Sequence, residues 1–334
     1  MGKPLAIILM ATYNPDLSWF REQLASIDHQ TYENIQLFVC DDCSSAVDRE
    51  QLETIIKQYI TRFPYRFIRN EINLGTNKTF ERLTSEASHI YHSENLKEVY
   101  FSYCDQDDVW ENNKTEALMN AVNQKSAVLA YSDMSVIDGE GNFLSDSITK
   151  VRKRFRYYEG DKLWKRILVH NFISGCCMII RADVAKAAIP FEVGMQRDRW
   201  LSVVASLNGS ISYVDEPLVR YRQHGGNQTG VLKGITDKRT YIDVRLRDHL
   251  EMLRSVRNRI KDHDEFMQFL DDYIEQTSTR YEYAAGEGIV FLNLVKMIRG
   301  LKWDRSVILF ETVALKLPDW LFNRVLEAIR NRNL

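Results

Sequence analysis

The sequence predicts an α/β fold: a mostly parallel central sheet with helices on both faces, followed by a C-terminal helical region. Short apolar runs alternate with amphipathic stretches up to about residue 222. Apolar, non-alternating strands joined by helices are typical of parallel sheets that are covered on both sides. From about Asp237 the pattern becomes helical and charged. A chain of 334 residues can form one large domain or two modest ones.

The first half reads as repeated strand–helix units. Leu52, Ile55, Ile56 and Tyr59 recur at helical spacing, and Asp16 or Ser18 are N-cap candidates for the first helix. The strands are expected over Leu5–Ala11, Ile35–Cys40, Tyr65–Arg69, Val99–Cys104 and Ala127–Ser132. The helices are expected over Leu17–His29, Arg49–Arg62, Thr76–Tyr91 and Asn113–Asn123.

The second half is less regular. The basic stretch Thr149–Tyr158 is expected to be a surface connection. Strands are expected over Phe172–Arg181, Ile211–Val214 and Leu218–Arg222, and helices over Ala182–Ala188 and Arg197–Leu207. The expected domains are residues 1–230, with halves 1–132 and 133–230, and a helical region over 231–334.

Composition excludes several classes of protein. The net charge of −2 gives no argument for nucleic acid as a partner. Five cysteines without a scaffold-like spacing are expected to be reduced thiols, although Cys40 and Cys43 leave zinc or redox chemistry as an alternative. No signal peptide and no apolar run of about 18 residues is found, so a cytoplasmic protein is expected.

The run Asp105-Gln106-Asp107-Asp108 is the strongest chemical signal. It places three carboxylates in four residues directly after the apolar stretch Val99–Cys104. Such a cluster is costly unless a cation lies among the carboxylates, and hard oxygen ligands suit Mg²⁺ or Mn²⁺. In extended backbone Asp105 and Asp107 would face the same way. The alternative is a solvated acidic loop that caps the helix from Asn113.

Polar residues also follow the three earlier strands, and the carboxyl ends of parallel strands gather ligands. Each group has a structural alternative, either a turn or a helix cap. The residues are Thr12, Tyr13 and Asn14 after the first strand, Asp41 and Asp42 after the second, and Asn73 and Gly75 after the third.

Two further residues lie in the second half. Asp198 is near the start of a predicted helix, where a carboxylate is stabilised, and it fits a general base or a helix cap. His224 ends a predicted strand before two glycines, where it fits a metal or phosphate ligand or an exposed side chain.

Together these segments resemble a family 2 glycosyltransferase with the GT-A fold, up to about residue 230. The D-Q-D-D-V-W form and the closing R-Y-R-Q-H-G-G-N are most similar to bacterial rhamnosyltransferases of cell-wall or capsular polysaccharides. The matching segments are 11–14, 39–44, 73–75, 103–110, 175–177, 197–200 and 221–224.

The resemblance implies roles for these residues. Asp105 and Asp107 correspond to the D-x-D that binds ribose and a divalent metal, with Asp107 as the direct ligand and His224 nearby. Asp198 falls where the family places its catalytic base. Arg197 departs from the acidic residue or His that often precedes this base. The expected substrate-binding residues are Thr12, Tyr13, Asn14, Asp41, Asp42, Asn73, Gly75, Asp105, Gln106, Arg199 and Trp200.

The implied activity is inverting, metal-dependent transfer of L-rhamnose from dTDP-β-L-rhamnose to a lipid-linked polysaccharide, with Mn²⁺ or Mg²⁺ as cofactor. A UDP-sugar donor is one alternative. Others are a nucleotidyltransferase, which would need a Gly-rich basic loop after the first strand, and a non-catalytic sugar-nucleotide-binding or scaffold protein.

The C-terminal segment from Lys296 to Leu334 carries eight Lys or Arg and four Asp or Glu, a local net charge of +4. Val307, Ile308 and Phe310 belong to an apolar helical face. A basic amphipathic segment is typical of contact with an anionic membrane surface. A helical subdomain or a homo-oligomer contact is the alternative, and a lipid-linked acceptor favours the inner face of the cell membrane.

Overall fold

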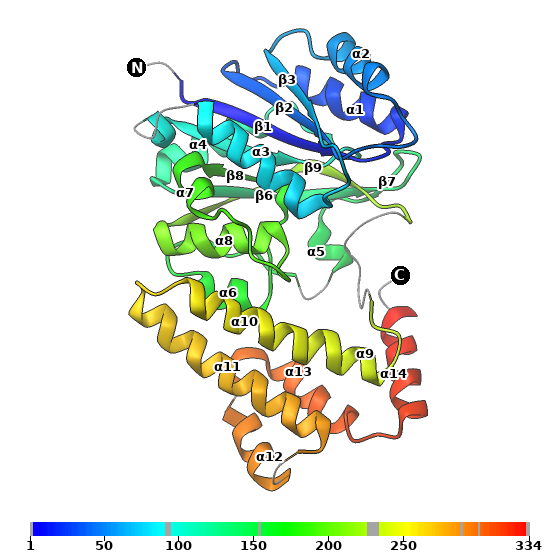
Figure 1. Cartoon of the computed structure of the whole chain (residues 1–334), viewed down its shortest axis with the longest axis vertical. Helices are drawn as coiled ribbons and strands as arrows, with labels where there is room; N and C mark the ends of the chain where they lie inside the picture. The colour runs from blue at the N-terminus through cyan, green and yellow to red at the C-terminus, as the bar shows by residue number, and fades with distance from the viewer. Residues whose placement is uncertain are drawn as a thin grey trace. The chain divides into compact units, whose positions relative to one another are not determined.

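A mixed, nine-stranded sheet forms the centre of the first of two units in the computed structural model (Figure 1), which describes residues 3–90, 95–152, 155–225, 234–287, 290–299 and 301–331. The first unit comprises Met1–Phe191 with Gln196–Gly225, and the second Glu192–Met195 with Gly226–Leu334. The expected boundary between residues 230 and 231 lies outside the described residues, as do Gly226 and Asn227.

The predicted parallel core is confirmed. Its four strands pair in the order β3-β2-β1-β4, and every pair is parallel. The strands are β1 (Leu5–Thr12), β2 (Ile35–Asp41), β3 (Tyr65–Arg69) and β4 (Val99–Cys104). Their carboxyl ends therefore meet at one edge, where the polar residues of interest follow them.

Beyond β4 the sheet becomes mixed. β8 (Met178–Arg181) pairs antiparallel with both β4 and β6 (Leu129–Ile137), and β6 runs parallel to β9 (Ile211–Arg222). Two short strands complete the sheet: β5 (Val109–Trp110) pairs with β9, and β7 (Phe143–Ser145) pairs with β6. β5 directly follows the acidic run and fixes its far end.

Several predicted boundaries are wrong in this half. Residues 211–222 form one strand with a register shift against β6, whereas the sequence suggested two. The strand expected over Phe172–Arg181 begins only at Met178, because Gly175–Cys177 form a tight turn of 3-10 helix, η2. Strands β5 and β7, and helices α5 (Ile148–Val151) and α6 (Trp164–Val169), were not predicted. Each is short and held by tertiary contacts, which local periodicity does not report.

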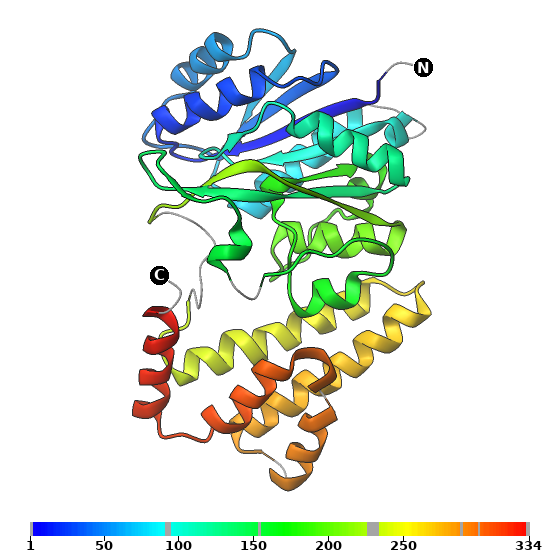
Figure 2. The ribbon, with the colours of Figure 1, turned by 180° about the vertical axis from the view of Figure 1, so that it is seen from behind.

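Helices cover both faces of the sheet because strand side chains alternate. Ala6, Ile8 and Met10 of β1 belong to the core beneath α1 (Leu17–Asp28), α2 (Arg49–Tyr59) and α4 (Lys114–Lys125). On the other face, Phe80 of α3 (Thr76–Ile90) contacts Tyr103 with ring centroids 5.6 Å apart. Figure 2 shows α1 and α2 beside one another from behind. Further elements are η1 (Asn95–Glu98), α7 (Ala182–Ala187) and α8 (Arg197–Asn208).

The second unit is helical, as expected. Its core contains Tyr241, Leu246 and Phe322, and a buried ion pair joins Arg280 to Glu311 with nitrogen–oxygen distances of 2.6 and 2.7 Å. Its helices are α9 (Lys238–Ile242), a π-helical turn η3 (Asp243–Arg247), α10 (Asp248–Arg259), α11 (Asp264–Ala285), α12 (Val290–Arg299), α13 (Leu301–Ala314) and α14 (Asp319–Asn331). Among the described residues, none of the helices has the length and apolar character needed to cross a bilayer.

Candidate active site

The acidic run lies in a bend between β4 and β5, not in extended backbone. The expectation that Asp105 and Asp107 share a face through strand alternation is therefore wrong. The bend instead brings a side-chain oxygen of Asp105, one of Asp108 and the sulfur of Cys176 to within 4.8 Å of one another. Asp107 is not part of this cluster, and its carboxylate lies beside His224.

Each of the three carboxylates has a partner outside the acidic bend, either a basic side chain or a backbone N–H group. Nη2 of Arg197 lies 3.7 Å from Oδ1 of Asp105. Nε2 of His224 lies 2.9 Å from Oδ2 of Asp107. The backbone N–H of residue 222 donates to Oδ1 of Asp108 at 3.1 Å. The protein thus offsets part of the repulsion that the sequence attributed to a missing cation.

Burial sets the charge state of this cluster. Burial raises the pKa of Asp107, and the neighbouring Asp105 raises it further, while the hydrogen bond from His224 opposes the shift. Burial also raises the pKa of Asp108 well above its usual range, with Asp107 and Asp105 adding to the effect. Asp107 and Asp108 therefore resist ionisation unless positive charge is added nearby.

A buried lysine lies close to the acidic bend. Lys114 is fully buried, its Nζ lies 2.9 Å from the ring centroid of Trp110, and burial lowers its pKa to about 8. Within the described part of the chain, neither this Nζ nor Oδ2 of Asp108 has a hydrogen-bond partner. The partnerless oxygen of Asp108 lies in a cluster with Asp105 and the sulfur of Cys176, and a buried carboxylate oxygen of this kind fits a site for a divalent cation such as Mg²⁺ or Mn²⁺. Asp105 and Asp107, with His224 beside Asp107, are the ligands that the resemblance implies.

Arg222 fixes the acidic bend to the sheet, and sequence reasoning missed it. Its side chain is 1% exposed, and its Nε donates to the carbonyl oxygen of Asp107 at 2.9 Å. Its Nη2 lies 2.5 Å from Oε2 of Glu22 in α1. Its place two residues before His224 in the R-Y-R-Q-H string was the only available signal.

The carboxylates of Asp41 and Asp42, at the end of β2, accept most of their hydrogen bonds from donors of the protein. Asp41 pairs with Arg69 at 3.1 Å and accepts hydrogen bonds from Ser44 at 2.5 Å and Thr12 at 3.3 Å. Asp42 accepts from the side chain of Asn70 at 2.6 Å and from the backbone N–H groups of Leu74 and Gly75, both at 2.8 Å. Asp42 therefore shapes the loop after β3, where Gly75 has φ +79° and Asn73 donates to the carbonyl oxygen of Asp42.

The loop after β1 is joined directly to the acidic bend. The backbone N–H of Tyr13 donates to Oε1 of Gln106 at 2.8 Å, and Nε2 of Gln106 donates back to the carbonyl oxygen of Tyr13 at 3.2 Å. The Tyr13 side chain is about half exposed. Asn14 adopts φ +42° and accepts from the N–H groups of Ser45 and Ala46. Three strand ends are thereby tied together, with an exposed ring beside the carboxylates.

Asp198 lies in the first turn of α8. Its Oδ1 accepts from the N–H of Arg199 at 2.7 Å. Burial raises the pKa of Asp198, the adjacent Arg197 guanidinium opposes the shift, and Asp105 adds to it. Asp198 therefore lies within the electrostatic reach of Asp105.

Arg199 and Trp200 are engaged elsewhere. Nε of Arg199 donates to the carbonyl oxygen of Ile167 at 3.0 Å, and its Nη2 donates to that of Leu168. Trp200 is buried and donates its indole N–H to Ala188 at 2.8 Å. These contacts support the fold around α8 and give no support to a substrate contact.

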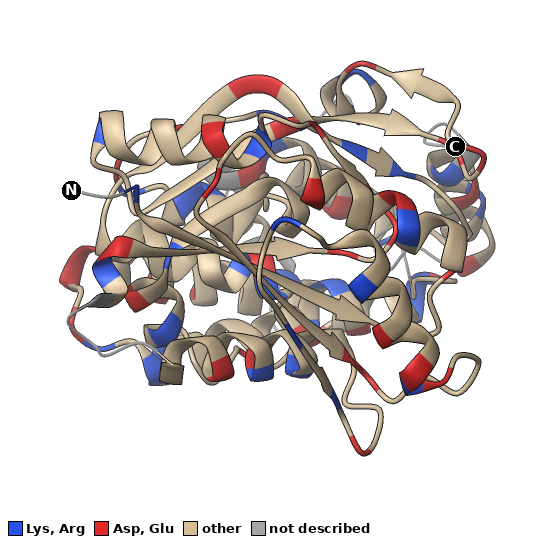
Figure 3. Cartoon of the chain, turned by 90° about the horizontal axis from the view of Figure 1, so that it is seen from above, with Lys and Arg blue, Asp and Glu red and all other residues tan. Residues whose placement is uncertain are grey.

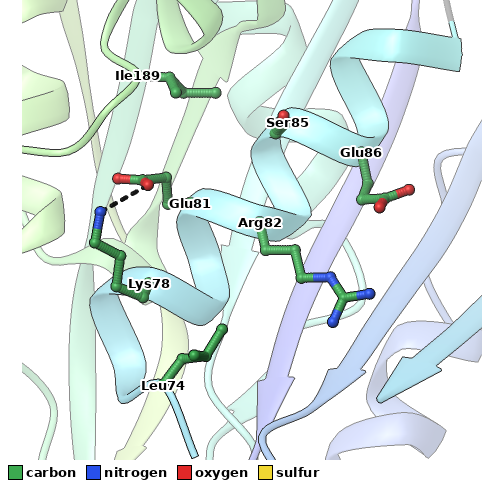
Figure 4. A pocket seen from close by; sticks show the side chains of 7 residues that line it. All are labelled: Leu74, Lys78, Glu81, Arg82, Ser85, Glu86 and Ile189. Atoms are coloured by element: carbon green, nitrogen blue, oxygen red, sulfur yellow. Dashed lines mark hydrogen bonds and ion pairs between the residues drawn. The ribbon is translucent and has the colours of Figure 1, made fainter. Parts of the chain in front are cut away.

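A cavity of about 320 Å³ lies beside α3, away from the acidic bend. Figure 4 shows its side chains along α3, with the ion pair between Lys78 and Glu81. Only Leu74 of its lining belongs to the loop after β3, and the acidic residues 105–108 do not line it. Lys and Arg are interspersed with Asp and Glu along the chain (Figure 3), so the acidic bend is a local feature.

The fold is thus a mixed α/β sheet with a cluster of carboxylates directly after one of its parallel core strands. The family model "Glycosyl transferase family 2" matches residues 7–187, and the chain belongs to this family. An uncharacterized glycosyltransferase of Rickettsia typhi is 27% identical over 68% of this chain and 66% of its own length. The chain thus spans just under two thirds of that relative.

Two other similar proteins have names that state a sugar nucleotide. A dTDP-rhamnosyl transferase, RfbG of Shigella flexneri, is 26% identical over 66% of this chain and 73% of its own length. The solved structure of S. aureus TarS 1–349 in complex with UDP-GlcNAc has a TM-score of 0.56 at 16% identity, covering 93% of this chain and 82% of that one. The latter similarity concerns the fold, and it confirms the predicted GT-A class.

Proposed function

We propose that this chain is an inverting, metal-dependent glycosyltransferase that uses a nucleotide-sugar donor. The observation that carries the proposal is the acidic bend after β4, where Asp105 lies with Asp108, Asp107 pairs with His224, and Asp105 acts electrostatically on both Asp107 and Asp198. A bound Mn²⁺ or Mg²⁺ would neutralise charge that builds on the leaving nucleoside diphosphate.

The chain's own residues supply the remaining chemistry. Asp198 takes the proton from the acceptor hydroxyl as its oxygen attacks the anomeric carbon. Burial makes this carboxylate a stronger base than an exposed aspartate. A single displacement inverts the anomeric centre, so a β-linked donor gives an α-linked product. We expect an oxocarbenium-like transition state, as in glycoside hydrolysis.

The nucleoside is expected to lie at the ends of β1 and β2. The half-exposed Tyr13 ring offers a stacking surface for the base, and Gln106 holds its backbone. Thr12 and Asp41 are buried and already hydrogen-bonded to each other, so they support the site from behind. The donor we favour is dTDP-β-L-rhamnose, in line with the RfbG similarity. A UDP-sugar is the second candidate, because the TarS structure holds one.

The proposed acceptor is a lipid-linked glycan, reached at the inner face of the cell membrane. Among the side chains of α12 that the structure describes, the exposed ones are Leu292, Val295, Lys296 and Ile298, an apolar and basic set. Trp320 of α14 is 63% exposed, with Arg324 at 5.9 Å from its ring. Co-sedimentation with anionic vesicles but not with neutral vesicles would support this contact, and a self-associated state with no lipid binding would replace it with an oligomer.

The activity is tested by donor hydrolysis and transfer with Mn²⁺, Mg²⁺ or EDTA, in the wild type and in Asp107→Ala. We expect turnover only with metal and a loss of at least about 1000-fold in the variant. Asp146→Ala, which removes an exposed carboxylate paired with Lys150, is the matched control. Donor binding without turnover in any condition would favour the non-catalytic alternative. Release of pyrophosphate from a nucleoside triphosphate would favour a nucleotidyltransferase.

A further inference from the structure

Arg197, the first residue of α8, is an unusual neighbour for an acidic metal site. Its side chain is 7% exposed, and its guanidinium carbon lies 3.5 Å from the ring centroid of Phe80 and 5.2 Å from that of Tyr103. These two rings, from α3 and β4, meet edge to face. The guanidinium is thus fixed from one side by aromatic packing, with Asp105 on another.

Gly175 makes room for this side chain. A Cβ on Gly175 would collide with Nη2 of Arg197 and lie 3.3 Å from its Cζ and 3.4 Å from its Nε. The backbone of Gly175 is not in the left-handed region, so close approach is the reason for glycine here. The 3-10 turn Gly175–Cys177 also carries Cys176, whose sulfur approaches Asp105 and Asp108.

The guanidinium of Arg197 lies near the carboxylate of Asp105 but does not form a hydrogen bond with it. The 3.7 Å separation is an ion pair longer than a hydrogen bond. Nε of Arg197 is buried and has no hydrogen-bond partner within the described residues. Arg197 therefore adds a positive charge to the acidic bend while leaving the oxygens of Asp105 open.

We propose that Arg197 is a positioning residue that orients Asp105 and, through its charge, weakens divalent-metal binding at the acidic bend. This inference rests on the proposed metal site. The fixed guanidinium of Arg197 stabilises the carboxylates of Asp105 and Asp198 in the metal-free protein. The same positive charge repels an incoming divalent ion. Arg197 would thereby lower the affinity of the donor-free protein for a divalent ion.

The test is the affinity for Mn²⁺ alone, measured by electron paramagnetic resonance, beside donor hydrolysis. For Arg197→Gln we expect Mn²⁺ to bind about fivefold more tightly, because the repulsion is removed. We expect kcat for hydrolysis to fall about 100-fold, because Asp105 is no longer oriented. If Arg197 had only a structural role, Arg197→Gln would lower both the Mn²⁺ affinity and kcat for donor hydrolysis.

Further variants separate charge from folding. Arg197→Lys keeps the charge, so its Mn²⁺ affinity should stay near that of the wild type. Gly175→Ala displaces the guanidinium and should tighten Mn²⁺ binding in the same direction as Arg197→Gln. Arg181→Gln, which removes a part-buried arginine paired with Asp183, is the control and should leave Mn²⁺ affinity unchanged.

Unchanged or weaker Mn²⁺ binding in folded Arg197→Gln overturns the inference and leaves the proposed activity intact. If that variant does not fold, unchanged Mn²⁺ binding in Gly175→Ala overturns it. Tighter Mn²⁺ binding in an enzyme that transfers no sugar would support the inference while the proposed function fails. A wild type that binds no Mn²⁺ overturns both the inference and the metal part of the proposal.

Discussion

Two acidic clusters follow the strands that flank β1, and they differ in how many protein donors reach their carboxylate oxygens. Asp41 and Asp42, after β2, have exposed fractions of 0% and 4%, and cation, hydroxyl, amide and backbone donors occupy their oxygens. After β4, Asp105 stays partly exposed with only a long ion pair, and Oδ2 of Asp108 has no hydrogen-bond partner in the described part of the chain.

The difference separates structural carboxylates from binding carboxylates. A carboxylate saturated by protein donors has no lone pair left for a ligand, whereas one with open oxygens is costly until a ligand arrives. Both clusters follow buried strands and read alike in the sequence. The number of donors that reach each oxygen, which only the fold decides, assigns Asp42 to the loop after β3 and Asp105 to the candidate metal site.

The largest expected effect is on stability, at the hydrogen-bonded carboxylate of Asp42. Asp42→Ala removes the acceptor of three hydrogen bonds, one from the buried amide of Asn70 and two from part-buried backbone N–H groups. We expect a loss of about 4 kcal/mol in the free energy of unfolding. Urea denaturation measures it, with Asp48→Ala, the N-cap of α2, as a control that should lose only about 1 kcal/mol. A loss no larger than the control would show that Asp42 is not structural.

On the binding side, Asp105→Asn should have the reverse profile. The amide keeps the shape of the side chain, and Asp105 is partly exposed, so we expect the free energy of unfolding to change by less than about 1 kcal/mol. Donor hydrolysis should fall about 100-fold, which corresponds to about 2.7 kcal/mol in activation free energy. Wild-type turnover in a folded Asp105→Asn protein would remove Asp105 from the site.

Mn²⁺ without donor should stabilise the folded protein by binding at the acidic bend after β4. At ten times its dissociation constant, Mn²⁺ should stabilise the wild type by about 1.4 kcal/mol, because it binds the folded state. Thermal unfolding should show this shift in the wild type and in Asp48→Ala, and lose it in Asp107→Ala. Equal shifts in all three proteins would mean that the ion binds elsewhere.

The smallest effect concerns pH. The pKa of Asp108 is raised in the folded protein by burial, then by Asp107 and Asp105. A raised folded pKa contributes stability below the unfolded value of about 3.9, and this stability is lost as pH rises through the folded pKa. Metal-free Asp108→Asn should therefore gain stability relative to the wild type between pH 4 and pH 7, on the order of 1 kcal/mol. A constant difference across this range would contradict the raised pKa.

Much of the parallel half was predictable. The strands β1 to β4 match their predicted ranges within one residue, and Asp16 caps α1 through the N–H groups of Ser18 and Trp19. Long buried strands and amphipathic helices carry strong local periodicity. The short elements β5, β7 and α6 carry little, and β9 is continuous because pairing with β6 bridges the polar residues Asp215 and Glu216.

The candidate site was predicted in residue type more than in geometry. His224 lies against Asp107, as the resemblance implied, 117 residues away along the chain. The pairing of Asp105 with Asp108 and Cys176, and the anchoring of the bend by Arg222, were not predicted. They depend on a backbone bend and on contacts between distant segments, which no local window contains.

The sequence by itself determined the class of fold, the ranges of the four strands of the parallel core, and the acidic residues that follow two of them, since local hydrophobic patterning marks each strand and its end. Only the tertiary structure decided which carboxylates remain open to a ligand. That choice depends on donors such as Arg69, Asn70 and Arg197, which approach from other elements once the chain has folded.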